Sequence, residues 1–308
     1  MTRVAVLGCG RMGSAMARSI HGRGHELVLY NRSPDKAEAL ATELGARTVA
    51  SPAEAVREVD VAITMLADRS AVEDVCGSDE GIVDGAHDGL VVVDMSTVEP
   101  EVAQALEPLV RARGGALLDA PVSGSVGLAE SGQLTVMVGG DPEALERARP
   151  VLDAVATRIT HVGPIGAGAA MKLAVNTVIF ALDVGLSEAL VLAERAGIER
   201  STAYDVFQAS AAGAPFVGYK RAAFLEPETA PTAFALDLAA KDLRLITALG
   251  DALGVPVAQA RINLDLVLAA AAAQGGDRDF ALVAEHLRTG RARAAAEPVG
   301  AGRREGRA

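Results

Sequence analysis

The sequence predicts an α/β protein in two parts, a doubly wound, mainly parallel sheet over residues 1–163 and an all-α domain over residues 164–290. Three observations lead to this prediction. Short β-branched runs alternate with helical patterns as far as residue 163, a glycine-rich loop follows the first run, and strand-like runs stop after residue 166. Such alternation is typical of βαβ units.

The elements follow in order along the chain. Strands are expected at residues 3–8, 26–31, 59–66, 89–96, 115–122, 133–140 and 158–163, and helices of the second part at 167–196, 200–211, 232–253, 256–273 and 279–288. The first of these helices would be about 45 Å long and is apolar on more than one face, so a homodimer or tetramer is expected. The tail at 291–308 lacks periodicity and is expected to be disordered.

Composition limits the kinds of partner. A formal net charge of −11 disfavours binding to nucleic acid or anionic lipid, which leaves a small molecule as the expected ligand. Cys9 and Cys76 have no ligand-spaced neighbours, so neither a metal site nor a disulfide framework is expected. The longest apolar segment, 166–197, is interrupted by polar and charged residues, so we expect no membrane span and a cytoplasmic protein.

A glycine loop lies between the first strand and the first helix. Its glycines would allow a tight turn, close approach of a pyrophosphate and close packing of the helix, in that order. The helix N-terminus would then offer free amides to the phosphates. The loop predicts a Rossmann-type dinucleotide site with cofactor contacts from Gly8, Gly10, Arg11, Met12 and Gly13.

The end of the second strand indicates which dinucleotide is bound. An acidic residue that would hold the ribose of NAD is replaced by Asn31, and Arg32 follows it. Arg32 can pair with a 2′-phosphate, and Asn31, Ser33 and Lys36 can add hydrogen bonds. NADP(H) is therefore predicted over NAD(H), whose use stays open. Ser33 before Pro34 is also an ordinary start of a helix.

Four further segments carry a family resemblance: DMSTVEP (94–100), DAPVSGSVGLAESGQLTVMVGG (119–140), GPIGAGAAMKLAVN (163–176) and FALDLAAKDLRL (234–245). Together with the glycine loop, they resemble the β-hydroxyacid dehydrogenase family, which includes 3-hydroxyisobutyrate dehydrogenases, tartronate semialdehyde reductases and glyoxylate/succinic semialdehyde reductases. The resemblance covers residues 3 to about 288. It implies an active site in a cleft between the two domains.

The resemblance also implies residue roles. It makes Lys172 the catalytic residue and assigns substrate binding to Ser123, Gly124, Asn176, Thr97, Phe234 and Asp242. It assigns further cofactor contacts to Met65, Leu66, Thr97 and Lys241. One departure stands out, because the family usually has two glycines after the serine and this chain has Gly124 followed by Ser125. Ser125 would narrow the substrate site.

These residue types suit hydride transfer to a carbonyl carbon. The chain has only four lysines among its 29 basic residues, and Lys172 lies inside an alanine-rich apolar run with Asn176 one helical turn later. An ammonium there can donate a proton to the developing alkoxide, and a neutral amine can remove a hydroxyl proton in reverse. Burial and the nearby charge of Lys241 would lower the pKa of Lys172.

Structural alternatives exist for several of these residues. Lys172 could extend from an interface helix to water, Ser123 and Gly124 could form a simple turn, and Asp242 could pair with Lys241 or Arg244. For the whole chain, the leading hypothesis is an NADP(H)-preferring oxidoreductase that interconverts a short hydroxyacid and the matching semialdehyde or oxo acid. The alternatives are an imine reductase, which usually lacks such a lysine, and a non-catalytic nucleotide-sensing protein.

Overall fold

The computed structural model describes residues 2–290. The chain forms two compact units. The first comprises residues up to 181 together with 237–265, and the second comprises residues 182–236 together with those from 266 on. Residue 163, the predicted end of the first domain, is the last residue of the sheet. The domain boundary at that residue stays a prediction. The tail expected to be disordered, 291–308, lies outside the described residues.

The first unit is built on one twisted sheet. Its strands lie in the order β3-β2-β1-β4-β5-β6-β8-β7, with β9 paired to β8. Their bounds are β1 Arg3–Leu7, β2 Glu26–Tyr30, β3 Arg47–Thr48, β4 Val61–Thr64, β5 Val91–Asp94, β6 Ala116–Asp119, β7 Val122–Ser123, β8 Leu134–Gly139 and β9 Ala156–Gly163. Strands β1 to β6 are mutually parallel, and β8 runs antiparallel to β6 and β7. The expected strands are confirmed, whereas β3 and β7 are too short to show a period of two.

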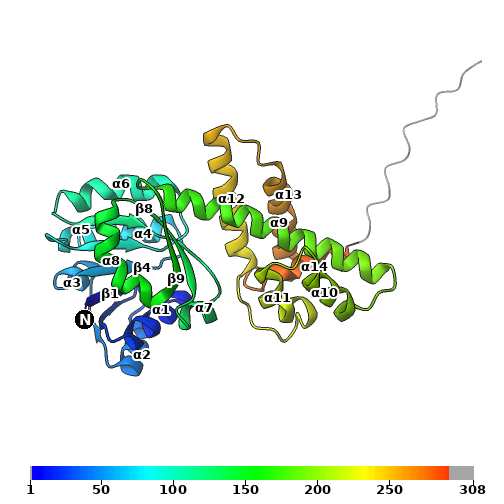
Figure 1. Cartoon of the computed structure of the whole chain (residues 1–308), viewed down its shortest axis with the longest axis horizontal. Helices are drawn as coiled ribbons and strands as arrows, with labels where there is room; N and C mark the ends of the chain where they lie inside the picture. Colours follow the sequence, from blue (N-terminus) through cyan, green and yellow to red (C-terminus); the bar gives the residue numbers. More distant parts are fainter. Residues whose placement is uncertain (1, 291–308) are drawn as a thin grey trace, which may run out of the picture. The chain divides into compact units, whose positions relative to one another are not determined.

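Helices cover both faces of the sheet (Figure 1). One face packs against α1 (Arg11–Gly22), α2 (Pro34–Leu44), α7 (Val126–Glu130) and α8 (Pro142–Val155). The other packs against α3 (Pro52–Val56), α4 (Arg69–Gly77), α5 (Ile82–Gly85) and α6 (Pro100–Arg111). Strands β4 and β5 are fully buried as a result, which explains their continuous apolar runs.

Helix α9 (Ala167–Arg195) follows the last strand and has 29 residues, as the sequence predicts. By length and composition alone it could cross a membrane, since its most apolar stretch has a mean hydropathy of 1.7. The buried core helix of a soluble protein can meet the same criterion of length and hydropathy. The side chain of Asn176 in α9 is buried and donates a hydrogen bond to Asp242 of α12 (Leu236–Leu253), a contact inside the first unit.

The second unit is helical. It contains α10 (Arg200–Ala209), α11 (Pro215–Leu225), the 3₁₀ turn η1 (Phe280–Leu282), α14 (Val283–Thr289) and parts of α9 and of α13 (Ala258–Gln274). Beyond residue 163, β-type pairing among the described residues is confined to one bridge between Ala235 and Asp279. The α/β class with an all-α second half is confirmed. Helix α11 was not expected from the sequence, although Pro215 at its first turn is a usual start signal.

Candidate active site

The glycine loop joins β1 to α1, and its shape depends on two close approaches. A Cβ atom at Gly8, where φ is +110°, would lie 2.3 Å from the Met65 carbonyl oxygen, and one at Gly13 would lie 1.9 Å from the Gly8 oxygen. A Cβ at Gly10 would meet none of the described protein atoms within 4 Å. Gly10 therefore leaves space at the start of α1 for a pyrophosphate, and the loop fits a dinucleotide.

Asn31 holds this loop against the end of β2. Its side-chain oxygen accepts a hydrogen bond from the Cys9 amide at 2.9 Å, and its side-chain nitrogen donates to the Ser33 carbonyl at 2.9 Å. Ser33 occupies the N-cap position of α2, but within the described chain its hydroxyl does not cap the helix. The structure thus gives Asn31 a bracing contact that the sequence did not indicate.

A cavity of about 430 Å³ opens beside the loop at the carboxyl ends of the strands. Its walls come from the loop, the end of β2, the end of β4 and helix α4. The predicted cofactor residues that line it are Gly8, Gly10, Asn31, Arg32, Ser33, Met65 and Leu66, and Lys36 lines it as well. Ligands of open α/β sheets bind at this edge, so the cavity has the expected place for a nucleotide.

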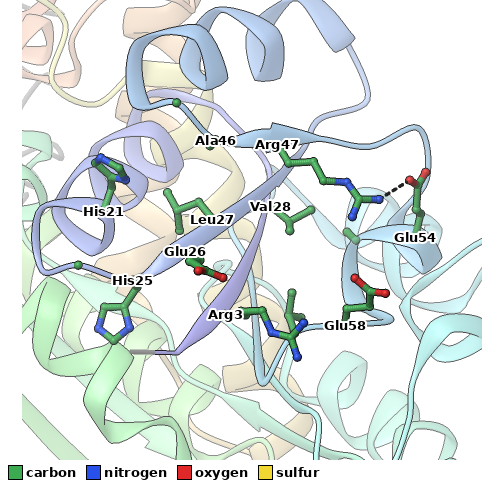
Figure 2. Close-up of a pocket in the computed structure, with 14 residues that line it drawn as sticks. Arg3, His21, His25, Glu26, Leu27, Val28, Ala46, Arg47, Glu54 and Glu58 are labelled. Carbon is green, nitrogen blue, oxygen red and sulfur yellow. Dashed lines mark hydrogen bonds and ion pairs between the residues drawn. The ribbon is translucent and has the colours of Figure 1, made fainter.

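A larger hollow of about 540 Å³ lies at the opposite edge of the sheet. Figure 2 shows Arg3, Glu26 and Arg47 around it, with Arg47 paired to Glu54, and His25 at its border. These residues lie near the amino ends of β1, β2 and β3. Because no predicted site residue lines this hollow, its size does not make it the candidate site.

Four predicted residues lie together in the first unit. The Asn176 side chain donates to Asp242 Oδ2 at 2.8 Å, and Lys241 Nζ lies 3.0 Å from Asp242 Oδ1. Lys241 Nζ also donates to the carbonyl oxygens of Thr97 at 2.7 Å and Ala67 at 3.2 Å. Asp242 is only 2% exposed. Its carboxylate therefore joins α9 to α12, while Lys241 joins α12 to the loops after β4 and β5.

Lys172 lies one turn before Asn176 on α9. Burial is the main cause that lowers the pKa of its ammonium from 10.5 to about 8. The charge of Asp242 raises this pKa and the charge of Lys241 lowers it further, so both groups act on the same amine. The direction agrees with the expectation from the sequence. An amine with a pKa near 8 can both donate and accept a proton near neutral pH.

Ser123 and Gly124 lie at the end of β7. Gly124 has a φ of +144°, and a Cβ there would lie 2.7 Å from Leu134 Cδ2, so the backbone requires glycine. Ser125, the departure from the family pattern, is the N-cap of α7, and its Oγ accepts a hydrogen bond from the Leu128 amide at 3.4 Å. Its hydroxyl oxygen is thus turned to the helix. The substrate-binding roles of Ser123 and Gly124 stay predictions.

Phe234 belongs to the second unit, where a buried ion pair fixes its surroundings. Its amide donates to Asp279 Oδ2 at 3.2 Å, and its ring packs edge-on against Phe280 at 5.7 Å between centroids. Lys220 Nζ lies 2.5 Å from Asp279 Oδ1 and 4.1 Å from the centre of the Phe280 ring. The role of Phe234 as a wall of the substrate site stays a prediction. Nothing in the sequence pattern pointed to Lys220.

Asp119, the last residue of β6, was not among the residues predicted from the sequence. It is 2% exposed, and its two oxygens accept hydrogen bonds from the amides of Gly166 and Ala169, each at 2.8 Å. A carboxylate at the end of a strand gave no signal for this contact, which spans about fifty residues of chain. Among residues 2–290, no three His, Cys, Asp or Glu side chains gather in a way that could hold a metal ion.

Comparisons with known proteins agree with this arrangement. Residues 3–163 match the NAD binding domain of 6-phosphogluconate dehydrogenase, and residues 166–287 match the family described as NAD-binding of NADP-dependent 3-hydroxyisobutyrate dehydrogenase. The chain is 34% identical to glyoxylate/succinic semialdehyde reductase 1 of Arabidopsis thaliana, over 94% of this chain and 99% of that protein.

Two solved structures extend the comparison. A Mycobacterium tuberculosis 3-hydroxyisobutyrate dehydrogenase with L-serine is 34% identical, with a TM-score of 0.81 over 94% of this chain and 99% of that one. The protein Psf3, in complex with NADP⁺ and 2-OPP, is 25% identical, with a TM-score of 0.84 over 92% of this chain and 99% of that one.

The dinucleotide loop and a lysine of lowered pKa lie in one compact unit, which is compatible with the chemistry of hydride transfer. The chain belongs to the β-hydroxyacid dehydrogenase family, as the sequence resemblance implied. It is accordingly an NAD(P)-dependent oxidoreductase.

Proposed function

We propose that the protein is an NADP(H)-preferring enzyme that reduces a short semialdehyde or oxo acid to the hydroxyacid, with Lys172 as the general acid. The proposal rests on the place of Lys172 on α9, one turn before the buried Asn176 that donates to Asp242, where burial lowers the pKa of its ammonium to about 8. The Arabidopsis relative, named for glyoxylate and succinic semialdehyde, supports this class of substrate.

The nicotinamide cofactor would supply the hydride, and the protein's own residues handle the proton. In reduction, the Lys172 ammonium donates a proton to the carbonyl oxygen as negative charge develops there. In oxidation, the neutral amine removes the hydroxyl proton. Asp242 keeps Asn176 and Lys241 in place through its two oxygens. Ser123 and Gly124 would bind the substrate carboxylate.

The preference for NADP(H) rests on the end of β2. Arg32, Ser33 and Lys36 line the cavity beside the glycine loop, and position 31 carries an amide where a carboxylate would repel a 2′-phosphate. The similar structure of Psf3, which was solved with NADP⁺, supports the preference for NADP(H). Arg32 is exposed, so its guanidinium can reach a phosphate without disturbing the fold.

Initial rates test the substrate class. Glyoxylate, succinic semialdehyde, 3-hydroxyisobutyrate and L-serine would each be assayed with both cofactors. We expect reduction of the first two with NADPH. Activity confined to the last two with NAD⁺ would contradict the proposal.

Two variants test the residue roles. Lys172→Met should lower kcat by about 10² to 10⁴-fold, the usual contribution of a positioned acid. Arg158→Met, which removes an exposed cation on β9, should leave kcat unchanged.

Arg32→Glu should lower kcat/KM for NADPH relative to NADH by about tenfold or more, since it replaces an attraction to the 2′-phosphate by a repulsion. Arg57→Glu makes the same charge change on the exposed end of α3, outside the cavity, as its control.

We also propose a homodimer. Val178 and Leu192 on α9 are 66% and 72% exposed, and large exposed apolar side chains on one helix suit an interface between subunits. Light scattering coupled to gel filtration would measure the mass. A monomer at micromolar concentration would contradict this part of the proposal.

A further inference from the structure

Asp119 makes an unusual contact for a carboxylate at the end of a strand. Its two oxygens accept hydrogen bonds from the amides of Gly166 and Ala169, at the start of α9. The first amides of a helix have no partner inside the helix, and they are usually satisfied by a residue next to the helix in sequence. Here the cap comes from another strand of the sheet. The capped amide of Ala169 lies three residues before Lys172.

Close packing holds the same turn of α9 against the sheet. A Cβ at Gly168 would lie 2.2 Å from the Asp119 carbonyl oxygen and 2.6 Å from that of Met137, so the helix backbone rests directly on the ends of β6 and β8. A Cβ at Gly139 would lie 2.4 Å from Asp119 Oδ1. Two glycines and one carboxylate therefore determine where α9 begins.

The chemistry of the cap requires two acceptor atoms. A carboxylate can accept from two separate N–H donors, whereas an asparagine would turn an NH₂ group toward one of them. Burial raises the pKa of Asp119, and the buried Asp94 on the neighbouring strand raises it too, although the bonds from Gly166 and Ala169 oppose this. Holding the start of a helix with a buried carboxylate that lies next to a second buried carboxylate costs folding free energy.

Asp119 also begins the segment that contains the other half of the candidate site. Ser123 and Gly124 follow it by four and five residues, through Pro121 and the short strand β7. Asp119 thus contacts the start of α9, the helix that carries Lys172. It also lies close in the chain to Ser123 and Gly124, the expected binders of the substrate carboxylate.

We propose that Asp119 is a positioning residue for the reaction, which fixes the amine of Lys172 relative to Ser123 and Gly124. This inference rests on the proposed function of Lys172. Misplacement of a reacting group by about 1 Å can cost 10²-fold in rate, so loss of the cap should act on the chemical step. Loss of the cap should leave the affinity for the nucleotide unchanged, because the glycine loop follows β1, whereas Asp119 ends β6.

A double-mutant cycle tests the proposal. Asp119→Asn, Lys172→Met and the double variant would be compared by single-turnover oxidation of NADPH at high enzyme concentration, with succinic semialdehyde or glyoxylate as the hydride acceptor. Rates would be normalised to the NADPH-binding sites titrated by fluorescence, so that any unfolded fraction does not count. Asp141→Asn is the matched control, since Asp141 caps α8 by accepting a bond from the Glu143 amide at 3.0 Å and α8 carries no site residue.

We expect Asp119→Asn to lower the normalised rate at least tenfold with the Kd for NADPH within twofold of the parent value. In the Lys172→Met background the same change should have less than a twofold effect, because the group being positioned is already absent. Gly168→Ala, which pushes the turn away from the sheet, should behave in the same way. Asp141→Asn should leave the rate unchanged.

Other results would overturn the inference. An equal loss of rate in both backgrounds would make Asp119 a general structural residue, and a parental rate in Asp119→Asn would give it no role. Full activity of Lys172→Met alone is a different outcome, because it would refute the proposed function itself.

Discussion

Replacement of Lys172 by Met should make the protein more stable at the same time as it removes activity. Burial lowers the pKa of the folded-state ammonium from 10.5 to about 8. At about 1.4 kcal/mol per pKa unit, the charged form costs the fold about 3 kcal/mol at pH 7. Methionine has a similar length and no charge, so the variant should unfold with a free energy higher by up to that amount.

The sign of the effect sets its pH dependence. Since the folded pKa lies below the unfolded one, the cost is complete below pH 8, shrinks between pH 8 and 10.5 and vanishes above that range. Urea unfolding would be followed by far-UV circular dichroism, because the chain contains no tryptophan. The difference between parent and variant should fall by more than half from pH 7 to pH 9.5, to roughly 1.4 kcal/mol.

Two results would refute this reasoning. A Met variant no more stable than the parent at pH 7 would mean that the ammonium is not strained by burial. A stability gap that stays constant up to pH 9.5 would mean that it arises from packing and not from ionisation. Lys36→Met serves as the control, since Lys36 is exposed, and its unfolding curve should match that of the parent at both pH values.

Three further predictions follow from the geometry. The rate of reduction should fall as pH rises through about 8 while the rate of oxidation rises, because the two directions need opposite forms of Lys172; parallel pH profiles would contradict this. Gly10→Ala should fold normally yet bind NADPH at least about tenfold more weakly, whereas Gly13→Ala should lose stability, and NADPH fluorescence with thermal melts would separate the two outcomes. Lys220→Met should destabilise the helical unit by about 3 kcal/mol because it leaves the Asp279 carboxylate buried without its cation; addition of Asp279→Asn should recover part of this loss in urea unfolding.

Much of the fold could be predicted because it follows from periodicity. Fully apolar runs between helical patterns give the parallel strands, and the loss of those runs after residue 166 gives the all-α half. A two-residue strand is too short to show the alternation of apolar and polar residues, so β3 and β7 were not predicted. Helix α11 was missed because its buried residues, among them Phe216 and Phe224, are interrupted by Gly218 and by the buried Lys220.

The candidate site was predictable in part. The glycine loop and the family motifs located the residues that meet at Asp242, because those residues lie in motifs of fixed spacing. Asp119 and Asn31 were different, since their contacts join positions that no local pattern links. Long-range hydrogen bonds depend on where strands and helices end in space, and a single sequence does not carry that information.

The scarcity of lysine has a practical consequence for chemical labelling. Of the four lysines, Lys220 is 1% exposed and bound to Asp279, Lys241 is held by Thr97 and Asp242, and Lys36 is exposed. Lys172 has an amine that is substantially unprotonated near pH 8, which is the reactive form toward electrophiles. Acylating reagents used near that pH would therefore meet the exposed Lys36 as the main competing lysine, and peptide mapping of the adducts would distinguish it from Lys172.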